Sequence, residues 1–267
     1  MSRTSIALTI AGSDSGGGAG IQADLKTFQA FGAFGTSVIT AITAQNTRGV
    51  RGVHAIPLDM VRLQLAAVAD DLPPAAFKTG MLATAELVVA IADEIRARAL
   101  PHYVLDPVMV ATSGDRLLDA DAEGAVASAL LPLCTLVTPN LDEARLLTGL
   151  EIDDESGMRA AGVTLLEMGA GAALVKGGHL EGREIVDVLV TRGIQRAWRR
   201  PKLETTSTHG TGCTLSAAIT AQLARGVALE DAVTSALDYV QRAIRFAPRV
   251  GGGHGPLNHS PPELRAN

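Results

Sequence analysis

Short apolar runs alternate with longer amphipathic stretches along most of this chain. Most of the short runs are continuously apolar, which is typical of strands that are buried on both faces of a sheet. The longer stretches repeat apolar residues with the period of a helix, as Ile21, Leu25 and Phe28 do in the first of them. This alternation predicts a layered α/β fold with a mostly parallel sheet. In open sheets of that kind, ligands bind beyond the carboxyl ends of the strands.

The predicted strands cover residues 6–10, 38–44, 76–81, 103–110, 135–138, 172–175 and 185–190. After the first helix, further helices are predicted over residues 58–71, 85–99, 142–148, 156–167, 211–224 and 229–246. The chain contains no serine- or proline-rich linker, charge block or internal repeat. We therefore expect residues 1–267 to form one domain, with the glycine-rich segment 251–256 as a loop.

The charge balance excludes several classes of partner. The chain has 23 Lys and Arg against 28 Asp and Glu, a net charge of -5. No cationic field attracts nucleic acid or an anionic membrane, and only 3% of residues are aromatic, too few for base-stacking platforms. No apolar run approaches the roughly 20 residues of a membrane span. We expect a small-molecule substrate, no nucleic acid and no membrane.

Two cysteines, Cys134 and Cys213, lie far apart in the chain, and the first residues show no signal-peptide pattern. This cysteine usage is typical of a reducing compartment, so we expect a cytoplasmic protein. Cys134 stands in an apolar run and is predicted to be a packing residue.

Residues 11–20, AGSDSGGGAG, follow the first predicted strand and open the first helix. Neither common nucleotide-binding motif fits them. A Walker A loop needs lysine where Gly18 stands, and GxGxxG needs glycine where Ile21 stands. Two interpretations remain: amides that approach an anion at a helix start, or a tight strand-to-helix turn.

A second glycine-containing segment, Gly210-Thr211-Gly212-Cys213, stands where another helix begins. Amides at a helix start have no acceptor within the helix and can form an anion pocket. A thiol in the first turn is expected to have a lowered pKa, which favours Cys213 as a base or nucleophile. The alternative is that Cys213 is a small hydrophobic residue.

Polar residues also follow other predicted strands. Asn140 is predicted to cap a helix, and with Glu143, three residues on, it can also hold a hydrated Mg2+. Lys176 directs a cation toward the end of the sheet, unless it is an ordinary surface lysine. Asp106 interrupts an apolar strand, and a buried acid is costly unless it is paired or linked to a metal.

Seven segments occur in the order AGSDSGGGAGIQADLKT, ITAQNTRGV, KTGML, LDPVM, TPNLDEA, LVKGGH and THGTGCTLSAAI. Together they resemble the hydroxymethylpyrimidine and phosphomethylpyrimidine kinases of thiamine biosynthesis, within the ribokinase-like superfamily. The resemblance extends from residue 6 to the tail at 255–259. It implies a three-layer α/β/α sandwich, ATP with Mg2+ as the phosphoryl donor, and a homodimer.

The resemblance also implies roles for individual residues. Cys213 stands at the position of the catalytic base, and the remaining catalytic positions are Gly210, Thr211, Gly212 and Lys176. The pyrimidine-binding positions are Gln45, Asp24, Met81 and Val108. The nucleotide-binding positions are Lys176, Asn140, Thr208 and Asp106, and the metal positions are Asn140 and Glu143.

The implied activity is phosphorylation of 4-amino-5-hydroxymethyl-2-methylpyrimidine and then of its monophosphate. The glutamine amide of Gln45 complements a ring nitrogen beside an exocyclic amine, which suits this substrate. The alternatives are a pyridoxal kinase or a bifunctional kinase, a pyrimidine sensor without turnover, and a cysteine hydrolase that uses Cys213 with His209.

Overall fold

Among the residues that the structure describes, nine strands form one central sheet, in the order β3-β2-β1-β4-β5-β6-β7-β8-β9. The structure is a computed structural model, and it describes residues 4–109, 120–178 and 182–262. The strands are β1 Ile6–Asp14, β2 Phe34–Asn46, β3 Gly49–Ala55, β4 Ala76–Thr79, β5 Tyr103–Leu105, β6 Leu136–Val137, β7 Ala172–Lys176, β8 Glu184–Thr191 and β9 Gln195–Pro201. Six neighbouring strands pair in parallel, in the order β2, β1, β4, β5, β6 and β7. β3 at one edge, and β8 and β9 at the other, pair antiparallel to their neighbours.

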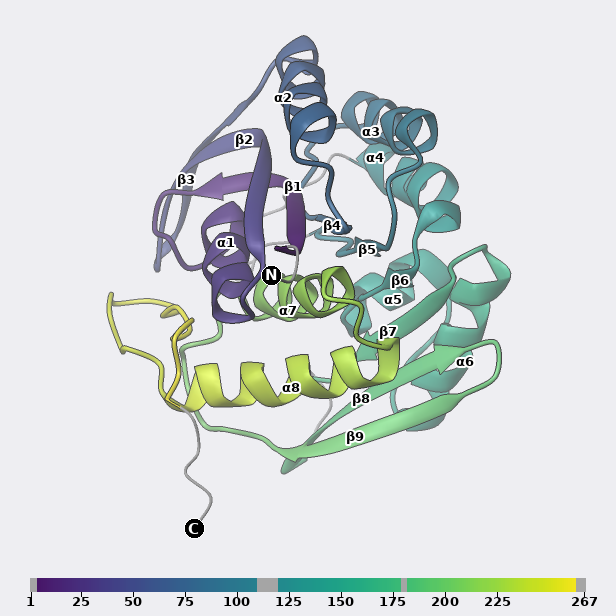
Figure 1. Cartoon of the computed structure of the whole chain (residues 1–267). Helices are drawn as coiled ribbons and strands as arrows, with labels where there is room; N and C mark the ends of the chain where they lie inside the picture. Colours follow the sequence, from purple (N-terminus) through teal and green to yellow (C-terminus); the bar gives the residue numbers. More distant parts are fainter. Residues whose placement is uncertain (1–3, 110–119, 179–181, 263–267) are drawn as a thin grey trace.

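Helices cover both faces of this sheet (Figure 1). One layer consists of α1 Gly20–Ala30, α7 Thr211–Ala224 and α8 Leu229–Arg245. The other consists of α2 Leu58–Asp71, α3 Ala85–Arg98, α4 Ala120–Ala125, the short turns η1 Val126–Leu130 and η2 Leu131–Leu133, α5 Leu141–Thr148 and α6 Glu155–Glu167. The predicted three-layer α/β/α arrangement with a mostly parallel sheet is therefore confirmed.

Successive residues of the central strands enter two separate apolar cores. In β1, Leu8 and Ile10 pack with α2 and α3, whereas Ala7 packs with α7 and α8. In β7, Val175 belongs to the same core as Leu8 and Ile10, whereas Leu174 belongs to the same core as Ala7. Side chains alternate across a strand, so a strand with apolar residues at every position has two buried faces. This accounts for the continuous apolar runs in the sequence.

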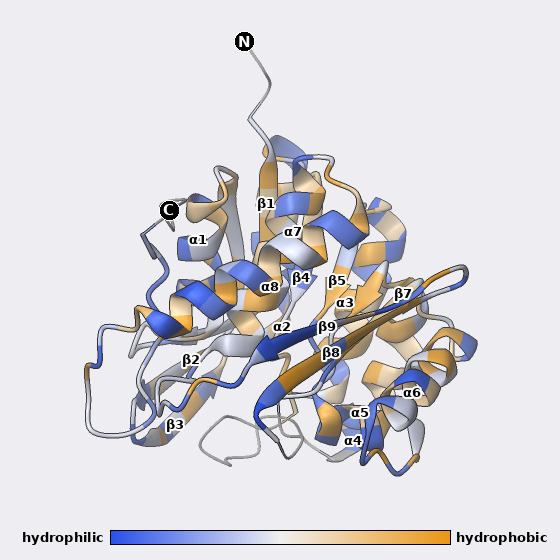
Figure 2. Ribbon diagram, turned by 90° about the horizontal axis from the view of Figure 1, so that it is seen from below, coloured by the Kyte–Doolittle hydropathy of each residue, from blue (hydrophilic) through white to orange (hydrophobic). Residues whose placement is uncertain are grey.

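The outermost helix, α8, shows how one face of a helix is chosen. Its buried residues are Ala232, Val233, Ala236, Leu237, Tyr239, Val240 and Ala243. They recur at three- and four-residue intervals and so form one stripe against α7. Hydrophilic residues recur on the turns of α8, while β8 is strongly hydrophobic (Figure 2). Within the described ranges, no helix combines the length and hydrophobicity that crossing a bilayer requires.

All the predicted helices are found, within two residues at each end. Three elements of the structure were not predicted: strand β3, strand β9 and the helical segment from α4 to η2. The predicted strand 103–110 is too long, because β5 ends at Leu105 and Pro107 has no amide hydrogen with which to continue the ladder. Residue 110 lies outside the described residues.

Candidate active site

The carboxyl ends of the parallel strands lie side by side at one edge of the sheet, and most of the predicted site residues follow them. Gln45 is at the end of β2, Met81 follows β4, and Asp106 follows β5. Asn140 follows β6, and Lys176 ends β7. In the strand order β2-β1-β4-β5-β6-β7, the strands followed by Gln45 and Met81 lie on one side of β5, and the strands followed by Asn140 and Lys176 lie on the other.

The loop between β1 and α1 already contains an anion, the carboxylate of Asp14. Its Oδ1 accepts from the Gly16 amide at 2.7 Å, and its Oδ2 accepts from the amides of Gly18 and Ala19 at 3.0 and 2.8 Å. These amides are the donors that the sequence analysis considered for an external anion. They stabilise a strand-to-helix turn instead.

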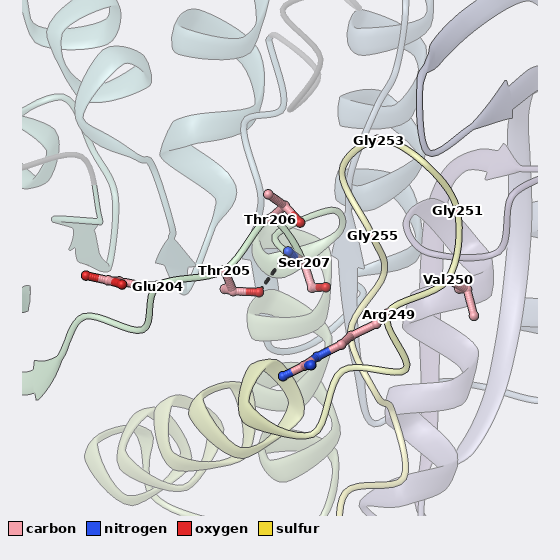
Figure 3. Close-up of a pocket in the computed structure, with 9 residues that line it drawn as sticks. All are labelled: Glu204, Thr205, Thr206, Ser207, Arg249, Val250, Gly251, Gly253 and Gly255. Atoms are coloured by element: carbon pink, nitrogen blue, oxygen red, sulfur yellow. Dashed lines mark hydrogen bonds between the residues drawn. The ribbon is translucent and has the colours of Figure 1, made fainter.

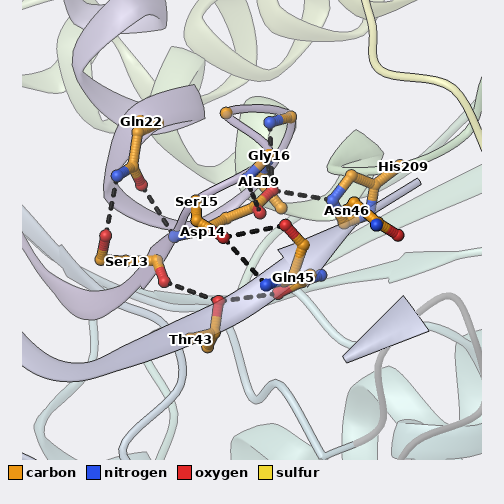
Figure 4. A network of polar contacts seen from close by, with 12 residues as sticks. Ser13, Asp14, Ser15, Gly16, Ala19, Gln22, Thr43, Gln45, Asn46 and His209 are labelled. Atoms are coloured by element: carbon orange, nitrogen blue, oxygen red, sulfur yellow. Dashed lines mark hydrogen bonds and ion pairs between the residues drawn. The ribbon is translucent and has the colours of Figure 1, made fainter. Parts of the chain in front are cut away.

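The same carboxylate joins two loops that are distant in the sequence. Nε2 of His209 lies 2.8 Å from Oδ2 of Asp14 (Figure 4). Although burial raises the pKa of Asp14, the hydrogen bond with His209 and the loop amides lower it below its usual value. His209 is thus hydrogen-bonded to Asp14, and no hydrogen bond between His209 and Cys213 is found among the described residues, so the structure gives the cysteine-hydrolase alternative no support.

Gln45 contacts this loop through its backbone. Its amide donates to Ser15 Oγ, which in turn donates to the Gln45 carbonyl, both at 2.8 Å (Figure 4). The side-chain Oε1 accepts from Thr43 at 3.2 Å, whereas Nε2 has no acceptor among the described residues. The loop after β1 therefore connects Gln45 on one side with His209 on the other.

The segment before α7 is shaped by Gly210, whose φ is +81°. A Cβ at this position would lie 1.9 Å from the carbonyl oxygen of Gly18, so only glycine allows the two loops to touch. Helix α7 has no side-chain cap. The amides of Gly212 and Cys213 have no acceptor in the described part of the chain, as is usual for amides in the first turn of a helix.

The expectation of a lowered thiol pKa is wrong. Cys213 is partly buried, and burial raises the pKa of its thiol to about 12. Lys78 and the backbone amide of Gly20 lower the pKa of the thiol, while Asp24 and Asp106 add to the rise. Burial is the largest of these influences and leaves the thiol harder to ionise than an exposed one. Cys134 is 4% exposed, and its packing role is confirmed.

Four charged side chains of alternating sign extend beneath α7. Asp24 Oδ1 lies 3.0 Å from Lys78 Nζ, which lies 3.8 Å from Asp106 Oδ2. Asp106 Oδ1 lies 3.6 Å from Lys176 Nζ. Lys176 is 15% exposed and is not an ordinary surface lysine. Asp106 is paired as a buried acid requires, and it also accepts from Ser216 Oγ at 3.0 Å.

Asp24 is the predicted site residue that the structure places elsewhere. Its side chain is fully buried, with Oδ1 on Lys78 and Oδ2 accepting from Thr9 Oγ1 at 2.7 Å. Both oxygens face the interior below Cys213. The prediction that Asp24 contacts the pyrimidine is therefore wrong.

Asn140 and Glu143 cap α5 reciprocally. Oδ1 of Asn140 accepts from the Glu143 amide at 2.9 Å, and Oε2 of Glu143 accepts from the Asn140 amide at 2.8 Å. Burial raises the pKa of Glu143 to about 7, Lys176 lowers it and Asp106 raises it. The predicted helix cap is confirmed. Within the described ranges, no three His, Cys, Asp or Glu side chains converge as metal ligands.

The remaining predicted residues line the same edge of the sheet. Met81 is 8% exposed, and its terminal methyl would lie 3.1 Å from a Cβ at Gly12. Val108 is half-buried just beyond Asp106. Thr208 accepts, through its carbonyl, from the Thr211 amide and hydroxyl, which fixes the turn into α7.

A hollow of about 280 Å³ lies between residues 204–207, which lead into the α7 turn, and residues 249–255 (Figure 3). Hydroxyl groups and glycine backbone form much of its wall. Neither Gln45 nor Lys176 lines it. This hollow therefore adjoins the candidate site without containing it.

Asp14, Lys78 and Ser216 also belong to this site, although they were not among the predicted site residues. Asp14 was visible within the first glycine-rich segment, and Lys78 begins the quoted segment KTGML. A lysine inside an apolar strand carries the same signal as Asp106, since a buried charge needs a partner. Ser216 had no comparable signal, because its contact depends on how α7 docks on β5.

The chain matches the family model described as phosphomethylpyrimidine kinase over residues 14–258. It is 53% identical over 259 residues to the hydroxymethylpyrimidine/phosphomethylpyrimidine kinase of Rhizobium meliloti, covering 96% of this chain and 97% of the relative. Among solved structures, phosphomethylpyrimidine kinase from Clostridium difficile has a TM-score of 0.81 at 43% identity, with 90% of this chain and 99% of that chain covered. Bacillus subtilis pyridoxal kinase in complex with ADP has a TM-score of 0.91 at 37% identity, with 97% and 98% covered. The chain thus belongs to the phosphomethylpyrimidine kinase family.

Proposed function

We propose that this protein transfers phosphoryl groups from ATP to 4-amino-5-hydroxymethyl-2-methylpyrimidine and then to the resulting monophosphate, in thiamine biosynthesis. Family membership supports the reaction class. The main structural support is the N-terminus of α7, where the unpaired amides of Gly212 and Cys213 lie beside Lys176. A Cβ on Gly212 would lie 3.3 Å from Lys176 Nζ, so amides and ammonium face one small space. Such an arrangement suits a transferring phosphoryl group.

The pyrimidine is proposed to bind on the β2 side of this space. The free Nε2 of Gln45 is a donor, and its Oε1 has a lone pair beyond the Thr43 contact. Together they match a ring nitrogen and the exocyclic amine beside it. Met81 and Val108 supply apolar contacts at the ends of β4 and β5.

The nucleotide is proposed to bind on the β7 side, where Lys176, Asp106, Asn140 and Thr208 lie. Lys176 neutralises phosphate charge. A Mg2+ ion would be held through water by Asn140 and Glu143 and would offset charge on the donor phosphates. The donor set fits such a hydrated ion, since the side-chain oxygens of Asn140 and Glu143 keep lone pairs beyond the capping contacts.

In the first transfer the acceptor is an alcohol. Its oxygen bonds to the γ-phosphorus, the bond from that phosphorus to the leaving ADP oxygen breaks, and the alcohol proton passes to the sulfur of Cys213. The thiol must be ionised beforehand, and Lys78 and the Gly20 amide favour ionisation. In the second transfer a phosphate monoester attacks. With a second pKa of about 6 it is already largely dianionic and needs no base.

Pyridoxal kinase activity is a second candidate, because a solved pyridoxal kinase is similar over nearly the whole chain. Pyridoxal also presents a hydroxymethyl group on a nitrogen heterocycle. The free amide of Gln45 favours the aminopyrimidine. Parallel assays of ADP formation decide between them by which substrate gives the higher kcat/KM.

The protein is further proposed to be a cytoplasmic homodimer with one kinase domain per chain. Ile42 on β2 and Val53 on β3 are each about half exposed, on opposite faces of the ribbon that these two strands form, and a second copy that packs around this sheet edge would bury both. Light scattering after gel filtration measures the mass directly. A monomer at micromolar concentration would contradict the dimer.

The decisive experiment is mass analysis of the products after incubation with ATP, Mg2+ and the hydroxymethylpyrimidine. Monophosphate followed by pyrophosphate is expected. Pyrimidine binding without ADP formation would instead indicate a sensor. Monophosphate alone would remove the second step from the proposal.

A further inference from the structure

Lys78 is a fully buried ammonium for which no role has yet been described. It lies in β4, with Asp24 at 3.0 Å and Asp106 at 3.8 Å, and none of its side chain reaches solvent. Burying an ammonium is costly even when it is paired, and an apolar side chain of similar volume often serves packing as well or better. Its place between two carboxylates therefore invites a functional explanation.

One of the two carboxylates, Asp24, belongs to α1, and the other, Asp106, is hydrogen-bonded to α7, the helix that carries Cys213. On α1, the backbone amide of Gly20 is among the groups that lower the pKa of the thiol, and Asp24 follows Gly20 by four residues on the same face. On α7, Ser216 follows Cys213 by three residues and donates to Asp106 at 3.0 Å. Lys78 bridges the two carboxylates, so it lies beneath the thiol at the junction of α1 and α7.

Proton transfer to Cys213 requires a thiolate in a poorly solvated place. Four charged groups act on the thiol: Lys78 from β4, Asp24 from α1, Asp106 after β5 and Lys176 from β7. Burial opposes ionisation most strongly, and Lys78 is the largest influence in its favour. Although burial alone lowers the pKa of Lys78, the nearby acids raise it above its usual range, so the ammonium stays charged.

We propose that Lys78 is a positioning residue of the first phosphoryl transfer: its ammonium, held between Asp24 and Asp106, stabilises the negative charge on Cys213 and fixes both carboxylates beneath it. This inference rests on the proposed function in one respect, the assignment of Cys213 as the base. It makes Lys78 important for the alcohol substrate and much less important for the monophosphate.

The first test measures thiol ionisation without any substrate. Iodoacetamide alkylation of Cys213 is followed from pH 7 to 10 by peptide mass spectrometry, with the buried Cys134 as an internal reference. Lys78→Gln is expected to slow alkylation about tenfold or more, which corresponds to at least about one pKa unit. Asp24→Asn is expected to accelerate it, because it removes a negative charge. Arg62→Gln, an exposed change on α2, is the control without effect.

The opposite signs separate electrostatics from misfolding, since damage to the fold would move both variants in the same direction. If Lys78→Gln does not fold, Asp24→Asn is compared with the charge-balanced double variant that also carries Lys78→Gln. Removal of the ammonium in that background is expected to slow alkylation about tenfold. Equal alkylation rates with and without Lys78 overturn the inference.

The second test compares the two transfers. Lys78→Gln is expected to reduce kcat about tenfold or more with the pyrimidine alcohol, while kcat with the monophosphate changes less than about threefold. Equal losses in both steps would mean a merely structural role and would overturn the inference. Failure of the proposed function can be told apart from failure of this inference. If the proposed function is wrong, the wild-type protein phosphorylates neither substrate, whereas the alkylation experiment tests the effect of Lys78 on the thiol without any substrate.

Discussion

The carboxylate of Asp14 lies 2.8 Å from Nε2 of His209 and so joins the end of β1 to the loop that begins α7. The same carboxylate accepts three amide hydrogen bonds from its own loop. Asp14 therefore holds together the loop between β1 and α1 and joins that loop to the segment before α7, which fixes the position at which α7 begins. The unpartnered amides of that helix are thereby held at a defined position relative to Gln45.

Asp14→Ala leaves three amides and an imidazole without their acceptor. We expect a loss of about 1–3 kcal/mol in the free energy of unfolding, because unsatisfied buried donors carry their desolvation cost. Urea unfolding at neutral pH measures it. Asp71→Ala, at an exposed position at the end of α2, is the control and should stay within about 0.5 kcal/mol of wild type. A loss no larger than that of the control would show that the carboxylate does not organise the loop.

Gly210 and Gly226 form a matched pair, with φ values of +81° and +80° at the two ends of α7. A Cβ on Gly210 would collide with the Gly18 carbonyl, whereas nothing lies within 4 Å of one on Gly226. Gly226→Ala is expected to cost only the strain of a left-handed residue, about 1–2 kcal/mol. Gly210→Ala is expected to cost more and to reduce kinase activity at least about tenfold, since it separates the two loops. Equal costs in thermal unfolding would argue against the tight contact.

The layered fold was predictable because its signals are local. Continuous apolar runs marked the central strands, and period-3.6 patterns marked the helices on both faces. The edge strands β3 and β9 were missed for a physical reason. Five of the seven residues of β3 are exposed, and β9 reads QRAWRRP, so neither has the apolar pattern of a buried strand. Both are held by antiparallel pairing with a neighbour, which the sequence does not display.

The sequence predicts which strand ends carry the site residues. It predicts less well how the charged side chains of the site are paired and how deeply they are buried. Lys176, Asn140 and Cys213 lie where the sequence placed them. The thiol pKa was misjudged, because the helix terminus is readable from sequence whereas burial by other elements is not. Asp24 was misplaced for a similar reason: its partner Lys78 is 54 residues away in the chain. The pairing exists only once α1 lies against β4.

Cys213→Ser tests the assignment of the base. The hydroxyl of serine is far harder to ionise than a thiol, so the transfer to the alcohol is expected to slow by about 10²–10⁴. Transfer to the monophosphate is expected to change much less, because that substrate supplies its own negative charge. Rates of ADP formation with each substrate give the comparison, and Cys134→Ser serves as the control for thiol loss elsewhere. Equal slowing of both transfers would remove Cys213 from the role of base.

The buried ring of His259, in the C-terminal segment, makes the free energy of unfolding depend on pH. Its ring is 7% exposed, and its Nε2 lies 3.1 Å from Thr214 Oγ1 in the first turn of α7. Burial, helped by the positive charge of Lys26, lowers the pKa of His259 from 6.5 to about 4. The folded protein therefore favours the neutral ring, while the unfolded chain takes up a proton near pH 6.5.

The stability that His259 contributes is consequently present above about pH 6.5 and is lost as the pH falls toward 4, by at most about 1.4 kcal/mol per pH unit. His259→Gln cannot take up this proton. We expect the difference in unfolding free energy between wild type and variant to shrink between pH 7 and pH 5, as measured by urea unfolding at each pH. His54→Gln, in the exposed part of β3, should leave the wild-type pH profile unchanged. A difference that stays constant across this range would mean that burial does not hold the ring of His259 neutral in the folded protein.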